Sequence, residues 1–273
     1  MSIPKQCLVE PGSKVKLHEH ATNATFGVER EEAERRLEEN TEAIRDLQHK
    51  LYAEHRRSML VVLQAMDAAG KDSTIRAVFS RTNPQAVHVR SFKRPTDEEL
   101  SHDFLWRIHR AVPGQGHIGI FNRSHYEDVL VARVDSLVPE SVWSTRYKAI
   151  NDFEHHIANS GTHIIKIFLH ISKARQREKL IRRLTDPRRN WKFEPADFET
   201  RKKWDKYTEA YEDALTKCSE KHAPWYIVPA DKKWFRLFAV SEIVRSRLEA
   251  MAPEFPKAHI DPEAALRLID QLE

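Results

Sequence analysis

The segment Gln64–Ile75, "QAMDAAGKDSTI", holds residues whose types and spacing could bind phosphate. Gly70 and Lys71 match the end of the pattern G-x-x-x-x-G-K-[ST], in which backbone N–H groups and a lysine hold phosphate oxygens. Two positions depart from it, because Ala65 replaces the first glycine and Asp72 replaces the Ser or Thr that would bind magnesium. The segment predicts a phosphate loop with an unusual way of holding its metal.

Two carboxylates, Asp67 and Asp72, flank Lys71 in this segment. They would repel a phosphate unless they held Mg²⁺ or protons, and Mg²⁺ prefers carboxylates together with substrate phosphate oxygens. We therefore expect both acids to be ligands of Mg²⁺, or of Mn²⁺ in its place. The alternatives are a plain strand-to-helix turn with a solvated Lys71, and Asp72 as a helix cap.

The loop should present its backbone N–H groups from position 68 to 71 to the phosphate, with the dipole of the following helix behind them. The candidate substrate-binding residues of this region are Ala68, Ala69, Gly70, Asp72, Ser73, Thr74 and Arg76.

A second polar group, "FNRSHYEDVLV" at positions 121–131, follows another strand-like run. Its head falls at the carboxyl end of the expected sheet, where α/β proteins bind ligands. Arg123 could form a bidentate contact with phosphate, whereas Asn122 occupies the place of the usual metal-binding Asp. Glu127 and Asp128 could reach a metal or a ribose, or they could be solvated acids in the first turn of a helix.

A third group is strongly basic and lies between Lys173 and Lys192, where nine basic residues face two acidic ones. Asp186-Pro187 interrupts its helical pattern, which suits a mobile lid that closes guanidinium groups over a phosphoryl group. Such a local charge predicts a polyanionic partner. A solvated helix or a nucleic-acid patch are the alternatives. The residues expected to touch substrate are Arg183, Arg188, Arg189 and Lys192.

The elements that must position these groups alternate along the chain. Apolar runs predict five strands, at 58–64, 86–91, 117–122, 163–170 and 225–230. Helical patterns cover 29–57, 73–79, 97–111, 139–160, 204–218 and 233–251, and Asp261 and Pro262 begin a helix in the tail. This alternation predicts an α/β fold, a doubly wound parallel sheet flanked by helices, in which the aromatic and aliphatic stripes form the core.

The bulk composition limits the class of protein. No stretch is long and apolar enough for a signal peptide or a membrane span, so we expect a cytoplasmic protein without membrane contact. The two cysteines, Cys7 and Cys218, are expected to be free thiols. We expect one domain over residues 1–273, with an N-terminal extension and helix at 1–57, a basic lid at 172–193 and a tail helix within 252–273.

Six blocks of sequence, in this order, resemble the polyphosphate kinase 2 family from about Gly27 to Met251. They are "LQAMDAAGKDSTI", "FKRPTDEELSHDFLWRIH", "GIFNRSHYEDVLVARV", "RRLTDPRRNWKF", "RKKWDKYTEAYEDAL" and "APWYIVPADKKWF". The resemblance implies a P-loop kinase fold with a helical lid. It also implies Mg²⁺-dependent phosphoryl transfer between inorganic polyphosphate and a nucleotide, and a homo-oligomer, either dimer or tetramer.

Family roles carry over to matching positions of this chain. The catalytic set implied is Asp67, Lys71, Arg123 and Arg183, with Asp67 and Asp72 handling the metal, and with Lys93, Arg189 and Lys192 near the phosphate chain. Asn122 departs from the Asp of many members, which moves metal binding toward Asp67. The Asn form is similar to the subgroup that phosphorylates both nucleoside mono- and diphosphates. Ser73 replaces a commoner glycine with little expected consequence.

We therefore expect transfer of the terminal phosphoryl group of polyphosphate to AMP, ADP or both. Two alternatives come from different classes. One is an ATP-dependent nucleoside or nucleotide kinase of the same fold. The other is a nucleic-acid-binding module that uses the basic stretch, although it would leave Asp67 and Asp72 unexplained; we do not expect nucleic acid as a partner.

Overall fold

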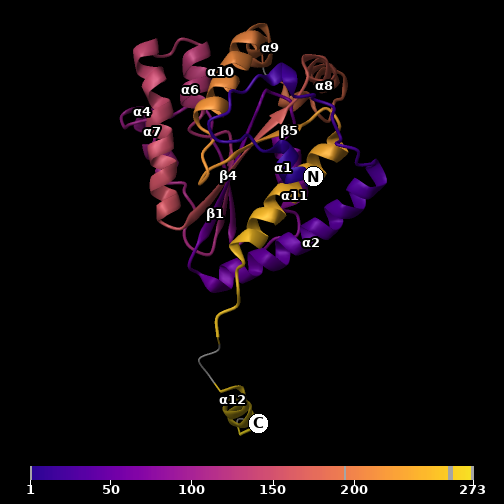
Figure 1. Ribbon diagram of the computed structural model, residues 1–273, viewed down its shortest axis with the longest axis vertical. Coiled ribbons are helices and arrows are strands. Elements are labelled where there is room, and N and C mark those ends of the chain that lie inside the picture. The colour runs from indigo at the N-terminus through magenta and orange to yellow at the C-terminus, as the bar shows by residue number, and fades with distance from the viewer. Residues whose placement is uncertain (1, 194, 258–260, 272–273) are drawn as a thin grey trace.

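The computed structural model describes residues 2–193, 195–257 and 261–271, and it contains a five-stranded, all-parallel sheet (Figure 1). The strand order is β2-β3-β1-β4-β5. The strands are β1 (Ser58–Ala65), β2 (Val87–Ser91), β3 (Ile118–Asn122), β4 (Thr162–His170) and β5 (Trp225–Pro229). All five strands predicted from the apolar runs are confirmed, with ends shifted by at most one residue.

Helices cover both faces of the sheet. Helices α2, α3 and α11 pack together on one side, and α6, α7 and α10 on the other (Figure 1). The longer helices are α2 (Arg30–Glu54), α3 (Lys71–Val78), α6 (Glu127–Val134), α7 (Glu140–Asn159), α8 (Lys173–Thr185), α10 (Trp204–Lys217), α11 (Lys233–Met251) and α12 (Pro262–Asp270). The short ones are α1 (Ile3–Cys7), η1 (Leu17–Glu19), α4 (Asp97–Leu100), α5 (Trp106–His109), η2 (Asn190–Lys192) and α9 (Ala196–Lys202).

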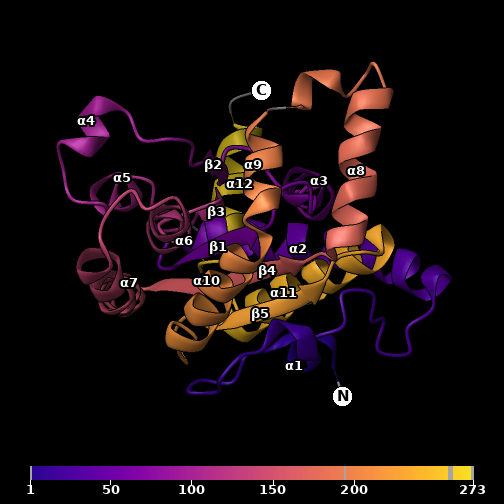
Figure 2. The same ribbon diagram turned by 90° about the horizontal axis from the view of Figure 1, so that it is seen from above.

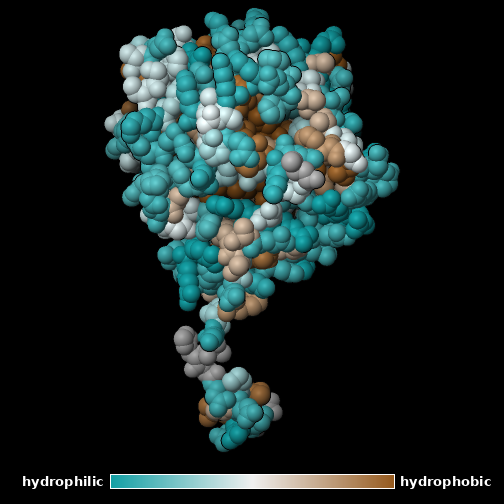
Figure 3. Space-filling view, viewed as in Figure 1, coloured by the Kyte–Doolittle hydropathy of each residue, from teal (hydrophilic) through white to brown (hydrophobic). Residues whose placement is uncertain are grey.

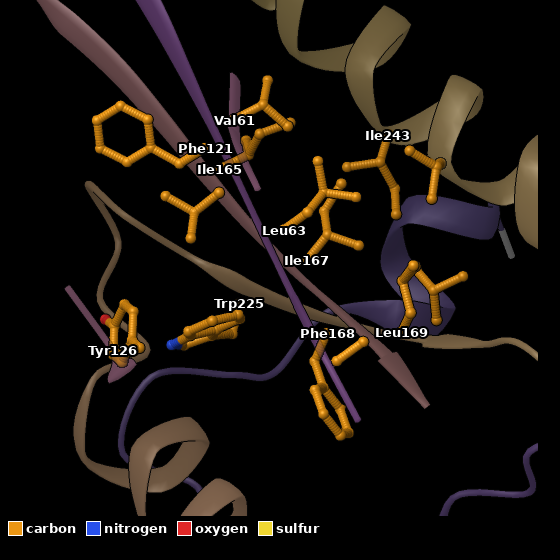
Figure 4. Packing of buried hydrophobic residues seen from close by; sticks show 14 of the residues in the cluster. Val61, Leu63, Phe121, Tyr126, Ile165, Ile167, Phe168, Leu169, Trp225 and Ile243 are labelled. Atoms are coloured by element: carbon orange, nitrogen blue, oxygen red, sulfur yellow. The ribbon is translucent and has the colours of Figure 1, made fainter. Parts of the chain in front are cut away.

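The central strand β1 is buried along its whole length, as its continuous apolar run predicts. Val61 and Leu63 from β1 pack with Ile165 and Ile167 from β4 (Figure 4). Trp225 of β5 packs edge-on against Tyr126 at 4.8 Å between ring centroids. This core holds the carboxyl ends of β1, β3 and β4 in register, and the loops that leave those ends carry the polar groups singled out above.

One predicted helix was wrong. Instead of a continuous helix over 97–111, the chain forms two single turns, α4 and α5. Thr96 begins the first turn through a capping box with Glu99. Before the second turn, Asp103 accepts from the N–H of Leu105 at 2.9 Å, an i to i+2 bond in the chain that leads into α5. Local capping side chains therefore interrupt the apolar spacing that suggested one helix.

The cysteines and the tail helix agree with the sequence-based expectations. Cys7 and Cys218 are free and buried, as expected. At the tail, Asp261 caps α12 by accepting from the N–H of Glu263, with Pro262 as the first helical residue, as the sequence predicts. The helix α12 lies apart from a mostly hydrophilic body, and Leu266, Leu268 and Ile269 are exposed on it (Figure 3). Within the described ranges, no helix is long and apolar enough to cross a membrane.

Candidate active site

The register of two neighbouring strands assembles the first two polar groups. Leu63 of β1 pairs with Asn122 of β3, so the segments that follow these residues leave the sheet side by side. The N–H of Arg123 donates to the Leu63 carbonyl at 3.1 Å, and Arg123 adopts a positive φ of 63°. This conformation turns the chain at the end of β3 and places Arg123 beside the loop that follows β1.

The loop of residues 66–70 has the form of a phosphate cradle. Gly70 caps α3 with φ 110°, a conformation that favours glycine. Lys71 reaches back over the loop, where its Nζ donates to the Ala65 carbonyl at 3.2 Å. Ala65 itself lies in regular strand, so this position requires no glycine. One detail of the prediction was wrong, because the Ala69 N–H closes a turn on the Met66 carbonyl and is not free for a ligand.

An acid–base–acid row crosses the floor of the site. The Arg123 guanidinium pairs with Asp67 at 2.9 Å and with Glu127 at 3.8 Å. Burial raises the pKa of Glu127, with the cations of Arg123 and Lys71 acting against the increase. The solvated reading of Glu127 was therefore wrong. Asp128 is not solvated either, because it pairs with Arg146 at 3.1 Å and lies 3.9 Å from Arg107.

The second loop acid faces the opposite wall. Asp72 is 72% exposed and accepts a hydrogen bond from the Asn122 amide at 2.8 Å. Lys192, from the far end of the basic segment, approaches the other oxygen of this carboxylate at 3.9 Å. The cap of α3 is Gly70, and Asp72 makes no side-chain cap bond. The capping role considered for Asp72 was therefore wrong, and its carboxylate is open toward the site.

The charges around Lys71 combine opposing effects. Burial lowers its pKa first and the Arg123 cation lowers it further, while Asp67, Glu127 and Asp72 act to raise it. A phosphate placed over Lys71 would add negative charge where two cations now repel each other. An anion bound at the loop would therefore reduce the repulsion between Lys71 and Arg123.

The residues present fit Mg²⁺ only as a partly solvated ion. Among the described residues, no group of three or more His, Cys, Asp or Glu side chains could hold a metal by themselves. Asp67 and Asp72 supply two carboxylates at the two ends of the loop. Mg²⁺ is held in this way when one or two carboxylates, substrate phosphates and water complete its octahedron. The donor set suits an ion that arrives with a phosphate ligand.

The basic segment forms a lid whose base is tied to the loop. Helix α8 rises from the body, and the chain returns through α9 (Figure 2). Gln176 donates to the Asp67 carbonyl at 3.1 Å, and Lys179 Nζ donates to the Ala69 carbonyl at 3.3 Å. Arg183 pairs with Asp197 of α9 at 2.7 Å, inside the lid. Lys192 of the lid lies 3.9 Å from the Asp72 carboxylate.

The remaining basic candidates are spread around the rim. Arg188 is 89% exposed and shares the Asp186 carboxylate with Arg189, at 3.2 and 2.9 Å. Arg76 is exposed on α3, and Lys93 is exposed just after β2. All four side chains are exposed, and among the described residues no hydrogen bond or ion pair joins any of them to the phosphate loop.

The hydroxyls of Ser73 and Thr74 turn inward. Each donates to the Gly70 carbonyl, at 2.9 and 3.0 Å, and so closes the first turn of α3. Both also accept hydrogen bonds from Arg236 of α11, a buried arginine that the sequence reasoning missed. The available signal was a lone arginine inside the apolar run "WFRLFAV", a place where a charge needs an explanation.

Comparison with known proteins identifies the family. The polyphosphate kinase 2 (PPK2) family model matches residues 27–256. An AMP/ADP-polyphosphate phosphotransferase of Meiothermus ruber is 53% identical over 219 residues, which is 80% of each chain. An ADP-polyphosphate phosphotransferase of Rhodopseudomonas palustris is 43% identical over 266 residues, 93% of this chain and 92% of the relative.

A solved structure agrees with these sequence matches. The crystal structure of polyphosphate kinase 2 from Arthrobacter aurescens TC1 superimposes with a TM-score of 0.95 and 39% identity. The match covers 99% of this chain and 97% of the other. The chain belongs to the polyphosphate kinase 2 family.

Proposed function

We propose that the protein transfers the terminal phosphoryl group of inorganic polyphosphate to AMP and ADP, giving ADP and ATP. The observation that carries this proposal is the grouping of Lys71, Arg123 and Lys192 with the carboxylates of Asp67 and Asp72 at one end of the sheet. The names of the relatives support the pairing of polyphosphate with adenine nucleotides.

The roles follow from the geometry. Polyphosphate enters along the basic lid and places its terminal phosphoryl group over Gly70 and Lys71. The acceptor phosphate binds Arg123, which Asp67 and Glu127 hold in place. Phosphoryl transfer depends mainly on positioning and charge neutralisation, and an ionised nucleotide phosphate is already a nucleophile. Lys71 and Lys192 would neutralise charge on the group in transfer.

We further propose that Asp67 and Asp72 hold Mg²⁺, with Mn²⁺ able to replace it. The ion would neutralise phosphate oxygens, which is its general part in phosphoryl transfer. The Asn122 amide keeps the Asp72 carboxylate oriented toward the loop and is itself uncharged.

The test is product analysis with purified protein. Polyphosphate is offered with AMP, ADP, GMP or GDP in separate reactions, with no ATP added, and the nucleotides are separated by ion-exchange chromatography. We expect ADP and ATP from AMP, and ATP from ADP, in reactions that chelation of Mg²⁺ stops. The absence of any phosphorylated product would overturn the proposal.

Two competing functions give different results in the same assays. An ATP-dependent kinase would phosphorylate AMP from ATP and ignore polyphosphate. A nucleic-acid-binding module would bind RNA or DNA with a steep dependence on salt and would transfer nothing. Homo-oligomer formation stays a prediction, which light scattering on the same preparation would check.

A further inference from the structure

A buried arginine lies directly beneath the phosphate loop. Arg236, in the first turn of α11, is 2% exposed. Its guanidinium donates to the Ala69 carbonyl at 2.7 Å, to the Thr74 hydroxyl at 3.0 Å and to the Ser73 hydroxyl at 3.0 Å. Three acceptors within the six consecutive positions 69–74, from the phosphate loop to the first turn of α3, are thus bound by one planar group.

Among the residues that the structure describes, this cation has no acidic partner. In the described part of the chain no carboxylate is bonded to Arg236, and its pKa is lowered to about 10, first by burial and then by the Arg175 cation. Burying an unpaired charge is costly, and a chain that needed only packing would place an apolar side chain here. A structural role alone does not account for a charge at this point.

The guanidinium also determines the shape of the loop. A Cβ added to Gly70 would lie 2.6 Å from a guanidinium nitrogen of Arg236. The Ala69 carbonyl accepts from Arg236 and also from Lys179 of the lid. A trans peptide group points its C=O and its N–H in opposite directions. The Gly70 N–H is therefore turned away from Arg236, and no acceptor for it exists among residues 2–193, 195–257 and 261–271.

We propose that Arg236 is a positioning residue for phosphoryl transfer: it holds the Ala69–Gly70 peptide so that the loop N–H groups face the phosphoryl group. The phosphate chain in turn is the anion that offsets this buried charge. The inference rests on the proposed function, because it concerns the same loop. It assigns a part to a helix that contributes no residue to the ligand side of the site.

The test compares two arginine variants on one helix. Arg236→Lys keeps a charge but cannot bind three acceptors as a planar fork. We expect kcat for ATP formation from polyphosphate and ADP to fall about 10²-fold, as for a small misplacement of reacting groups, with KM for ADP unchanged. Arg247→Met is the matched control, because Arg247 is a partly buried arginine of α11 about three turns away, and its Nε has no hydrogen-bond partner among the described residues. It should keep the wild-type kcat.

A double-mutant cycle separates positioning from folding. Thr74→Val removes one acceptor of Arg236 and should lower kcat about tenfold, the value of one hydrogen bond to a charged group. In the Arg236→Lys background the same change should have no further effect. Wild-type kcat in folded Arg236→Lys, or a loss no larger than in Arg247→Met, would overturn the inference. If Arg236→Lys does not fold, Thr74→Val decides alone, and an unchanged kcat rejects it.

A binding measurement keeps this inference separate from the proposed function. Sodium tripolyphosphate should raise the melting temperature of the wild type and of Arg247→Met, and much less that of Arg236→Lys. If the wild type is stabilised more than Arg236→Lys but makes no ATP, the proposed function fails, whereas the role of Arg236 in shaping the loop for phosphate binding stands. Equal stabilisation of wild type and Arg236→Lys, or no stabilisation of either, would overturn the positioning inference.

Discussion

Replacing Lys71 by Met would remove the loop cation while keeping most of its aliphatic length. The Nζ now donates to the Ala65 carbonyl, and its charge is opposed by burial and by Arg123. A side chain held under such repulsion contributes little to the stability of the substrate-free fold. We therefore expect the Lys71→Met variant to melt at or above the temperature of the wild type.

The loss of activity should be far larger. Two unit charges about 4 Å apart interact by about 4 kcal/mol at an effective dielectric constant of about 20. If that interaction is made fully only with the charge that builds up in transfer, its loss lowers kcat by about 10³-fold. The variant should thus keep or raise its melting temperature while it loses kcat, so a misfolded variant cannot imitate the result.

The assay is ATP formation from polyphosphate and saturating ADP, followed by luminescence, with melting temperature measured on the same sample. Lys148→Met is the control, because Lys148 is 82% exposed on α7 and pairs with Asp152 one turn further along the same helix. It should behave as wild type. Folded Lys71→Met that retains kcat within about tenfold of wild type would refute the loop assignment, since no 4 kcal/mol interaction could then be present.

Three further changes test other parts of the structure. Gly70→Ala would place a Cβ 2.6 Å from Arg236 on a backbone with φ 110°. It should lower the unfolding free energy in urea by at least about 1–2 kcal/mol, and it should also lower kcat. Wild-type values of both would contradict the loop geometry. Lys166→Met leaves the buried Glu154 carboxylate without its 2.5 Å partner and should cost about 3–5 kcal/mol in urea unfolding, whereas a neutral result would contradict the pairing. Burial first, and then Arg236, lowers the pKa of Lys179 from 10.5 to about 8, so the folded protein binds this proton less tightly than the unfolded chain. The unfolding free energy should rise between pH 8 and 10.5, and Lys179→Met should reduce that rise; identical pH profiles would count against it.

Local sequence was enough to predict the strands and the strand–turn–helix segment around Gly70 and Lys71. An apolar run followed by Gly70-Lys71 specifies a strand, a tight turn and a helix start through short-range preferences alone. The helix predicted over 97–111 was wrong, because Thr96 caps one short turn and Asp103 bonds to the N–H of Leu105 before a second one. Both bonds are short-range, so the apolar spacing alone was a poor guide where polar side chains bind nearby backbone groups.

The burial of Glu127 could not be predicted from the local sequence either. Glu127 looks like a solvated acid in the first turn of a helix. Its 3.8 Å approach to Arg123 spans only four residues, but its burial depends on the packing of α6 against α7 and α10. The same residue in an isolated helix would be exposed. Its raised pKa is a property of the assembled site, because burial is the main cause.

The sequence by itself determined the strand–turn–helix segment that carries Gly70 and Lys71, and from residue type and nearby spacing it predicts that a lysine, two carboxylates and a basic segment serve a phosphate ligand. Only the tertiary structure decided which groups meet. It brought Arg123 to Asp67 across neighbouring strands, and it brought Arg236 beneath Ala69 from a helix 167 positions away. The physical reason is that strand register and helix packing set these distances, and both depend on the whole core at once.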